Sequence, residues 1–401
     1  MEAPATTPRR TLVVLCAASL CWAFSFGLGA PLASLWLRDR ACGATVIGLN
    51  TSLYYLGIAV AALLVPYLMR RWGNSCAVAG MVASGVTVAL FPWAGGLVGY
   101  HLLRLLNGIA GAMSLIPLET RVNHNAEPAQ RARDFGCYAF CIALGMALGT
   151  LVGMQMYDAA PRLAFVQGGL FAVAAAVVVF GWLPAGTVAA EGPQRRTPLA
   201  FRRNFLSFGS AWSQGFLEGG MVALLPIYLA AIGITEGGMG WMMSGIMVGV
   251  IAFQVPVAWL ADRLGRTRVL LGCYAVAALG LALVPLGVGT FWLMLWLFLV
   301  GACSGAFYPL GLAILGQRLP AESVPRANAW YLAINCVGSL IGPTFTGALM
   351  DRLGRGAMFG AGEAAVLAVV AVWAVLAGYD LWRGRGARPE TTAALETRAA
   401  A

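Results

Sequence analysis

Three charged side chains interrupt long apolar stretches of the sequence, and they are the first candidates for chemistry. Arg104 and Glu218 stand well inside such stretches, with Gln214 one helical turn before Glu218 on the same face. A charge is costly in an apolar medium and tends to be kept there for function. Glu218 can exchange a proton or instead hold a permanent hydrogen bond to Gln214. Arg104 can bind a ligand, or pair with helix-end carbonyls or a carboxylate. Glu363 lies near the end of its stretch, where it can reach water.

The composition explains why these charges are unusual. Of the 401 residues, 60% are hydrophobic and only 10% are charged, whereas a soluble protein has about 25% charged residues. Membrane helices need about 20 apolar residues each, so the sequence predicts an all-α membrane protein. Residues Met1–Arg10 are polar and the next apolar run is long, so we expect no cleaved signal peptide. The predicted spans are approximately 11–36, 46–69, 76–95, 97–118, 136–156, 165–183, 205–230, 240–260, 269–287, 291–316, 328–349 and 359–382.

The positive charges predict the orientation of these spans. The net charge of +10 comes from arginine alone, because the chain contains no lysine. Twenty of the 26 arginines fall in the termini and connections on one side of the predicted membrane, and five fall on the other side. Positive charge gathers on the cytoplasmic side of membrane proteins. We therefore expect a protein of the plasma (inner) membrane with both termini cytoplasmic, and no nucleic-acid partner.

A polar connection, Pro184–Asn204, divides the chain into two halves of six spans each. The expected organisation is an N-terminal six-helix bundle (residues 1–183), a cytoplasmic linker (184–204), a C-terminal six-helix bundle (205–383) and a disordered cytoplasmic tail (384–401). The halves repeat at an offset of 192–193 residues: Pro66–Gly73 aligns with Ala258–Gly265, and Gly145-x-x-x-Gly149 aligns with Gly338-x-x-x-Gly342. A duplication of six-helix units explains this order.

The turn between spans 8 and 9, AWLADRLGRTR at Ala258–Arg268, is the most specific motif. It resembles the G-x-L-A-D-R-x-G-R-x-R loop of the major facilitator superfamily. Two further patterns resemble that family: Arg104-x-x-x-Gly108-x-x-x-Ala112 in span 4, and Gly338-x-x-x-Gly342-Pro343 in span 11. The resemblance covers nearly the whole chain. It implies twelve transmembrane helices in two six-helix bundles related by a pseudo-twofold axis, and transport by alternating access. Span 5 departs from the pattern of drug antiporters, because Thr150 stands where proline is expected.

The loop suggests a conformational latch. Gly265 permits a tight turn, and Asp262 can face the positive end of a neighbouring helix, with Arg263 and Arg266 beside it. We expect these four residues to stabilise the state that is closed at the cytoplasmic edge. The alternative is that Asp262 only neutralises nearby arginines. In the first half Arg70 replaces the aspartate, so the latch should be weak there.

The glycines of spans 5 and 11 allow close helix packing. In the family these spans form the seam along which the bundles move, so Gly145, Gly149, Gly338, Gly342 and Pro343 are candidate hinge or packing residues. The plain alternative is static packing. Because spans 1, 4, 7 and 10 line the cavity in the family, candidate cavity residues are drawn mainly from them. The candidates are Trp22, Arg104, Asn107, Gln214, Glu218, Tyr308, Tyr331 and Asn335.

These observations favour a monomeric secondary transporter in the lipid bilayer, moving a small-molecule substrate by alternating access. The weakly charged interior favours efflux, with Glu218 as the candidate for proton coupling. Uptake by a symporter or uniporter, and a transport-inactive scaffold or sensor, stay open as alternatives. The sequence has no G-x-x-x-x-G-K-[ST] loop, so ATP-driven transport by this chain is excluded. His101 and His124 are isolated; we expect no metal, no cofactor and no enzymatic activity.

Overall fold

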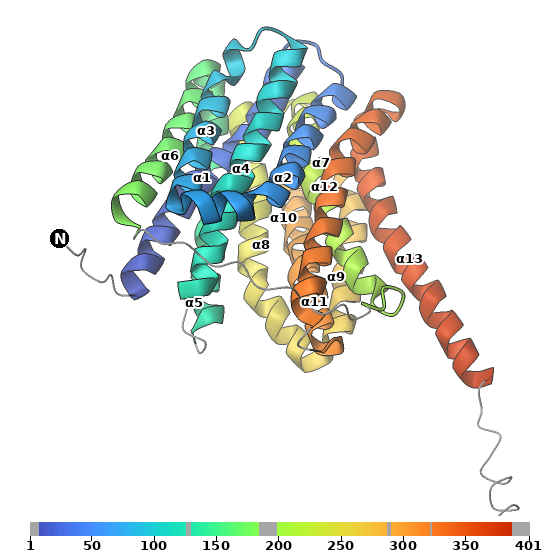
Figure 1. Cartoon of the computed structure of the whole chain (residues 1–401). Helices are drawn as coiled ribbons and strands as arrows, with labels where there is room; N and C mark the ends of the chain where they lie inside the picture. Colours follow the sequence, from blue (N-terminus) through green and yellow to red (C-terminus); the bar gives the residue numbers. More distant parts are fainter. Residues whose placement is uncertain (1–7, 126–129, 184–198, 287–289, 321–322, 387–401) are drawn as a thin grey trace, which may run out of the picture.

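A computed structural model describes residues 8–125, 130–183, 199–286, 290–320 and 323–386 (Figure 1). Within these ranges, 12 helical spans are long and apolar enough to cross a membrane. A helix pairs its backbone polar groups internally, which is what a span in lipid requires. Of the predicted linker and tail, residues 184–198 and 387–401 lie outside the described ranges.

The helices follow the predicted spans closely. The first half consists of α1 (Pro8–Arg38), α2 (Ala44–Trp72), α3 (Asn74–Leu90) with the short 3-10 helix η1 (Phe91–Trp93), α4 (Leu97–Asn125), α5 (Arg131–Ala159) and α6 (Pro161–Trp182). The second half consists of α7 (Phe205–Ala231), α8 (Glu236–Leu264), α9 (Arg266–Leu283) with η2 (Val284–Leu286), α10 (Thr290–Gly305), α11 (Phe307–Arg318), α12 (Val324–Leu353) and α13 (Ala357–Gly386).

The predicted tenth span is broken into two helices. One continuous helix was expected over 291–316, but α10 ends at Gly305 and α11 begins at Phe307. Pro309 has no backbone N–H, so it cannot bond the carbonyl of Gly305 four residues earlier. The chain tightens instead, with the Ala306 amide donating to the Cys303 carbonyl at 3.2 Å.

The repeat found in the sequence is present in the helix boundaries. Helix α8 begins and ends 192 residues after α2. The turns that follow these two helices use glycines with positive φ, Gly73 at 55° and Gly265 at 93°, a conformation that costs glycine little.

The predicted glycine rows lie inside the bundles. A Cβ at Gly149 of α5 would overlap the Phe24 carbonyl of α1, and a Cβ at Gly342 of α12 would overlap the Phe216 carbonyl of α7. In the same way, a Cβ at Gly145 would overlap the Leu20 carbonyl of α1, and a Cβ at Gly338 would overlap the Trp212 carbonyl of α7. These four glycines therefore hold α5 against α1 and α12 against α7. Pro343 differs from these glycines because it packs across the interface between the bundles: a Cβ at Gly48 of α2 would overlap the Pro343 carbonyl.

The two bundles meet along α2 with α12 and α5 with α8. We call the end at which α1 begins and α13 finishes the terminal end, which is the lower end in Figure 1. The opposite end, with the α1–α2 and α12–α13 turns, is the far end (Figure 1).

Candidate functional site

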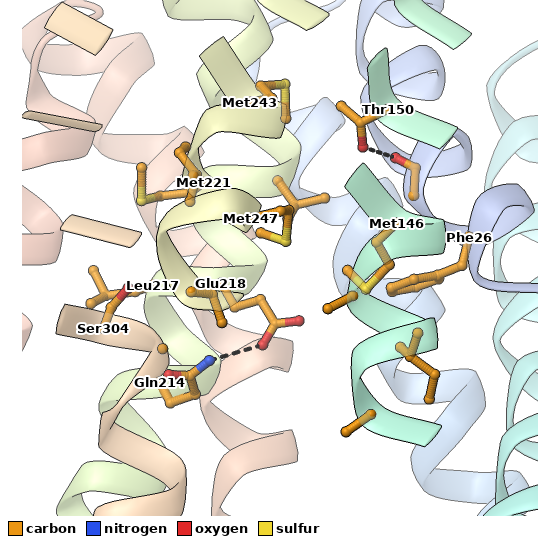
Figure 2. Close-up of a pocket in the computed structure, with 18 of the residues that line it drawn as sticks. Phe26, Met146, Thr150, Gln214, Leu217, Glu218, Met221, Met243, Met247 and Ser304 are labelled. Carbon is orange, nitrogen blue, oxygen red and sulfur yellow. Dashed lines mark hydrogen bonds between the residues drawn. The ribbon is translucent and has the colours of Figure 1, made fainter. Parts of the chain in front are cut away.

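A cavity of about 330 Å³ lies between the two bundles. Six helices line it, namely α1, α4, α5, α7, α8 and α10. Its volume falls in the range of small-molecule sites. Figure 2 shows side chains from α7 and α8 facing those of α1 and α5 across it.

Glu218 of α7 lies in this cavity together with Gln214, one turn away (Figure 2). The Gln214 amide donates a hydrogen bond from Nε2 to Glu218 Oε2 at 3.3 Å. The two residues lie on one face because they are four positions apart in the helix. Glu218 therefore lines the cavity and holds the hydrogen bond to Gln214 that was considered as the alternative to proton exchange.

A second carboxylate, Glu119 of α4, lines the same cavity. Glu119 was not among the predicted site residues, because the predicted span ended at residue 118 and placed Glu119 at the membrane edge. Within the described residues it makes no hydrogen bond or ion pair that we identify. Tyr138 of α5 lies beside it in the cavity wall.

The remaining wall is mostly apolar. Four methionines face the cavity, two of them from α8: Met146, Met221, Met243 and Met247. Phe26 and Phe135 add aromatic surface, and Ser304 of α10 adds a hydroxyl. Thr150, which replaces the expected proline of span 5, donates a hydrogen bond from its hydroxyl to the Gly27 carbonyl of α1 at 2.8 Å (Figure 2). That bond ties α5 to α1.

Arg104 and Asn107 lie inside the first bundle and not in the wall of this cavity. The Arg104 guanidinium stacks on the Tyr54 ring at 4.9 Å, a cation–π contact. Tyr54 packs against Phe26, which does line the cavity, with ring centres 5.6 Å apart. Asn107 donates to the Thr87 hydroxyl of α3 at 2.9 Å. Arg104 is thus separated from the cavity by aromatic rings.

The other four candidates are also placed in packing positions. Trp22 is buried and stacks on Phe26 with ring centres 5.6 Å apart. The Tyr331 hydroxyl donates to the Tyr308 carbonyl at 2.8 Å, joining α12 to α11, and the two rings meet edge to face. Asn335 donates to the Ala211 carbonyl of α7 at 2.9 Å. Only Gln214 and Glu218 of the eight candidates line the cavity.

The far end of the interface is held by Asp351 of α12. Its carboxylate accepts hydrogen bonds from the backbone N–H of Ala44 at 2.8 Å, the backbone N–H of Thr45 at 2.9 Å and the Thr45 hydroxyl at 2.6 Å. These groups form the N-terminus of α2, where a carboxylate satisfies free N–H groups and opposes the helix dipole. We call this contact the far-end clamp.

Further polar contacts join the bundles in the same half of the molecule. Arg38 at the end of α1 forms an ion pair of 3.2 Å with Glu236, the first residue of α8. Ser244 of α8 donates to the Ala147 carbonyl of α5 at 2.8 Å. Together with the far-end clamp, these contacts close the far side of the cavity.

A second cavity adjoins the first on the side of the terminal end and is lined by residues of the second bundle. It has a volume of about 230 Å³, shares Val250 and Gly305 with the first and reaches Asp262 and Arg266. In this structure Arg266 bonds within its own bundle, to the Ala313 carbonyl at 2.9 Å and to Asp262 at 3.5 Å. Arg263 stacks on the Trp259 ring at 3.8 Å.

The first half makes a related contact, but there the arginine stands on the fourth span and not in the turn that it joins. Asn74 is the equivalent of Arg266, and Arg121 is the equivalent of Ala313, each at an offset of 192 residues. The Arg121 guanidinium donates to the Asn74 side-chain oxygen. An arginine therefore joins the turn to the end of the fourth span in both halves, from α9 in one and from α4 in the other.

Within the described residues, no group of three or more His, Cys, Asp or Glu side chains is arranged to hold a metal ion.

Comparison with known proteins agrees with the fold. A family model described as Major Facilitator Superfamily matches residues 14–228 and again residues 204–399. The chain is 26% identical over 371 residues to the uncharacterized MFS-type transporter Ent638_1421 of Enterobacter sp. (strain 638), covering 88% of this chain and 92% of the relative. It is 25% identical over 345 residues to the uncharacterized MFS-type transporter YfkF of Bacillus subtilis (strain 168), covering 84% and 88%.

Solved structures show the same architecture. The nucleoside transporter NupG superposes with a TM-score of 0.74 at 15% identity, over 92% of this chain and 98% of that chain. A bacterial homolog of the human lysosomal transporter Spinster, in an inward-facing and unoccupied conformation, gives a TM-score of 0.71 at 14% identity, over 94% and 97%. These likenesses confirm the predicted fold of two six-helix bundles. Since the family and its named relatives are transporters, the prediction that the chain is not an enzyme is also confirmed.

Proposed function

Because the chain belongs to the Major Facilitator Superfamily of secondary transporters, we propose that it exports a small amphipathic solute by proton-coupled alternating access. The observation that carries the proposal is the cavity of about 330 Å³ between the bundles, which reaches Glu119 and Phe135 near the terminal ends of α4 and α5. Its far side is closed by the far-end clamp and the Arg38–Glu236 ion pair. A carrier must expose one site to one side of the membrane at a time. A cavity bounded by both bundles opens to one side and then to the other when the bundles rock about it.

The arginine distribution favours a cytoplasmic terminal end. With that orientation the structure is an inward-open state of a plasma-membrane protein. Export then begins with solute entering from the cytoplasm. The far-end clamp at Asp351 must break before the solute can leave.

Glu218 is the proposed proton-coupling residue. It is an ionisable group in the cavity, bonded to Gln214. If it takes up a proton from outside and releases it inside in each cycle, proton flow drives solute the other way. Asp262 and Arg266 are the proposed latch of the opposite, outward-open state. In the inward-open state they bond within their own bundle.

The function is tested with a solute screen on purified protein. Solutes that raise the unfolding temperature are then tested for counterflow in proteoliposomes. Ala139 lines the cavity, so the Ala139→Trp variant places a large side chain in it. This variant should abolish both the rise in unfolding temperature and the counterflow. Ala174→Trp adds the same volume on the exposed face of α6 and should retain both the thermal stabilisation and the counterflow. Solute binding without counterflow in the wild-type protein would favour the sensor alternative. Counterflow that survives Ala139→Trp would refute the cavity as the transport site.

A further inference from the structure

The central cavity is acidic and contains no positive side chain. Glu119 comes from α4 of the first bundle and Glu218 from α7 of the second. No arginine or histidine lines this cavity in the part of the chain that the structure describes, and the sequence contains no lysine. The nearby buried cation, Arg104, stacks on Tyr54 and lines a separate small cavity with Asn107.

The two carboxylates are poorly compensated. Glu218 receives the 3.3 Å bond from Gln214, which is long for a bond to a charged acceptor. Glu119 has no hydrogen-bond or ion-pair partner that we identify among the described residues. A carboxylate in apolar surroundings is costly unless a proton or a cation neutralises it. The cavity therefore favours positively charged occupants.

An acceptor beside Glu218 is also unused. Gln214 directs its N–H to Glu218, while its carbonyl oxygen Oε1 is buried and accepts no hydrogen bond within the described residues. A buried acceptor without a donor is costly. It can be satisfied by the N–H of a ligand that pairs with Glu218.

The wall indicates an organic cation and not a metal ion. Four methionines and the rings of Phe26, Phe135 and Tyr138 make most of the surface apolar. Methionine adapts its shape to different ligands, and aromatic faces attract organic cations. The two carboxylates stand on different bundles, and in the described part of the chain no third His, Cys, Asp or Glu side chain joins them to hold a metal ion, which needs a fuller set of ligands.

We propose that this chain binds amphipathic organic cations in the central cavity, with Glu119 and Glu218 neutralising the positive charge from opposite bundles and the methionine and aromatic wall holding the apolar part. The proposal rests on the function proposed above and specifies its substrate class. Since each bundle provides one carboxylate, a bound cation attracts both and favours their approach.

The test uses two probe ions of the same shape and opposite charge, tetraphenylphosphonium and tetraphenylborate. Binding to the purified full-length protein is measured by equilibrium dialysis in detergent. Tetraphenylphosphonium should bind at least tenfold more tightly than tetraphenylborate. Glu218→Gln and Glu119→Gln should each weaken tetraphenylphosphonium binding about tenfold. Glu363→Gln, a change of an acid that does not line the cavity, should leave it unchanged. Size-exclusion profiles establish that each variant is folded.

Equal binding of the two ions, or unchanged tetraphenylphosphonium binding in both cavity variants, would overturn the cation assignment. That result is separate from failure of the transporter proposal. A neutral or anionic solute that undergoes counterflow blocked by Ala139→Trp would preserve transport while refuting the substrate class. Selective cation binding without counterflow would refute transport while preserving the site.

Discussion

Replacing Asp351 by alanine should release the far end of the interface. The carboxylate accepts two backbone N–H groups and one hydroxyl at the start of α2, at 2.6–2.9 Å. All three donors belong to the opposite bundle, so the bonds exist only when the far end is closed. The substitution therefore destabilises one conformational state and leaves the packing within each bundle intact.

The magnitude follows from the type of contact. Losing a helix N-cap costs about 0.5–2 kcal/mol, and a carboxylate at a helix N-terminus contributes about 0.3–1 kcal/mol. Asp351 is exposed to solvent, which weakens the charge contribution. We expect the closed state to lose about 1–2 kcal/mol, which is about a 5- to 30-fold shift toward far-end opening.

Hydrogen–deuterium exchange measures this shift toward far-end opening, and it requires no label, so the native cysteines can be kept. Peptides covering residues 44 and 45 should exchange faster simply because their amides lose an acceptor. The informative peptides lie at the α5–α8 contact, around Ala147 and Ser244, which does not touch Asp351. They should also exchange faster if the bundles separate as rigid bodies.

Asp158→Ala is the matched control. Asp158 is exposed at the far end of α5 and makes no hydrogen bond or ion pair that we identify in the described residues, so exchange should stay as in the wild type. Faster exchange confined to residues 44 and 45 in Asp351→Ala would show a local loss of hydrogen bonds without opening of the far end, and would exclude Asp351 as a clamp between the bundles.

Three further changes test the latch, the proton coupling and the packing of α5 against α1. Asp262→Asn should lower transport several-fold with normal expression, whereas Arg70→Ala should do much less; equal losses in a flux assay would contradict an asymmetric latch. Glu218→Gln should stop proton-driven accumulation but allow exchange at saturating solute, and accumulation that persists would exclude Glu218 from coupling. Gly149→Ala should lower the unfolding temperature, because its methyl group meets the Phe24 carbonyl. Gly181→Ala, in open space on α6, should leave that temperature unchanged or raise it.

The sequence predicted the fold well because lipid leaves few alternatives. A span of 46–69 became α2 at Ala44–Trp72, since an apolar run in a membrane must pair its own backbone groups. The break at Ala306 was missed, although Pro309 was a visible signal. Helix periodicity also could not show that the glycines at 149 and 342 face α1 and α7 within the bundles.

The site was only partly predictable. Gln214 and Glu218 were found from their charge, polarity and shared helix face. Glu119 was missed because an acid at the end of a span looks like a residue at the membrane surface, and only tertiary packing places it in the cavity. Arg104 was expected in the cavity, but the Tyr54 ring lies against it, and no sequence pattern specifies that contact.

Alternating access itself is most directly tested by distances across both ends of the molecule. Spin labels on noncanonical amino acids at the exposed positions Asp158 and Ile232 report the far end, and labels at Arg71 and Leu264 report the terminal end. Double electron–electron resonance is measured for each pair in the wild-type protein and in Asp351→Ala. If access alternates, Asp351→Ala should lengthen the far-end distance and shorten the terminal-end distance in the same fraction of molecules. Lengthening at the far end without shortening at the terminal end would contradict alternating access.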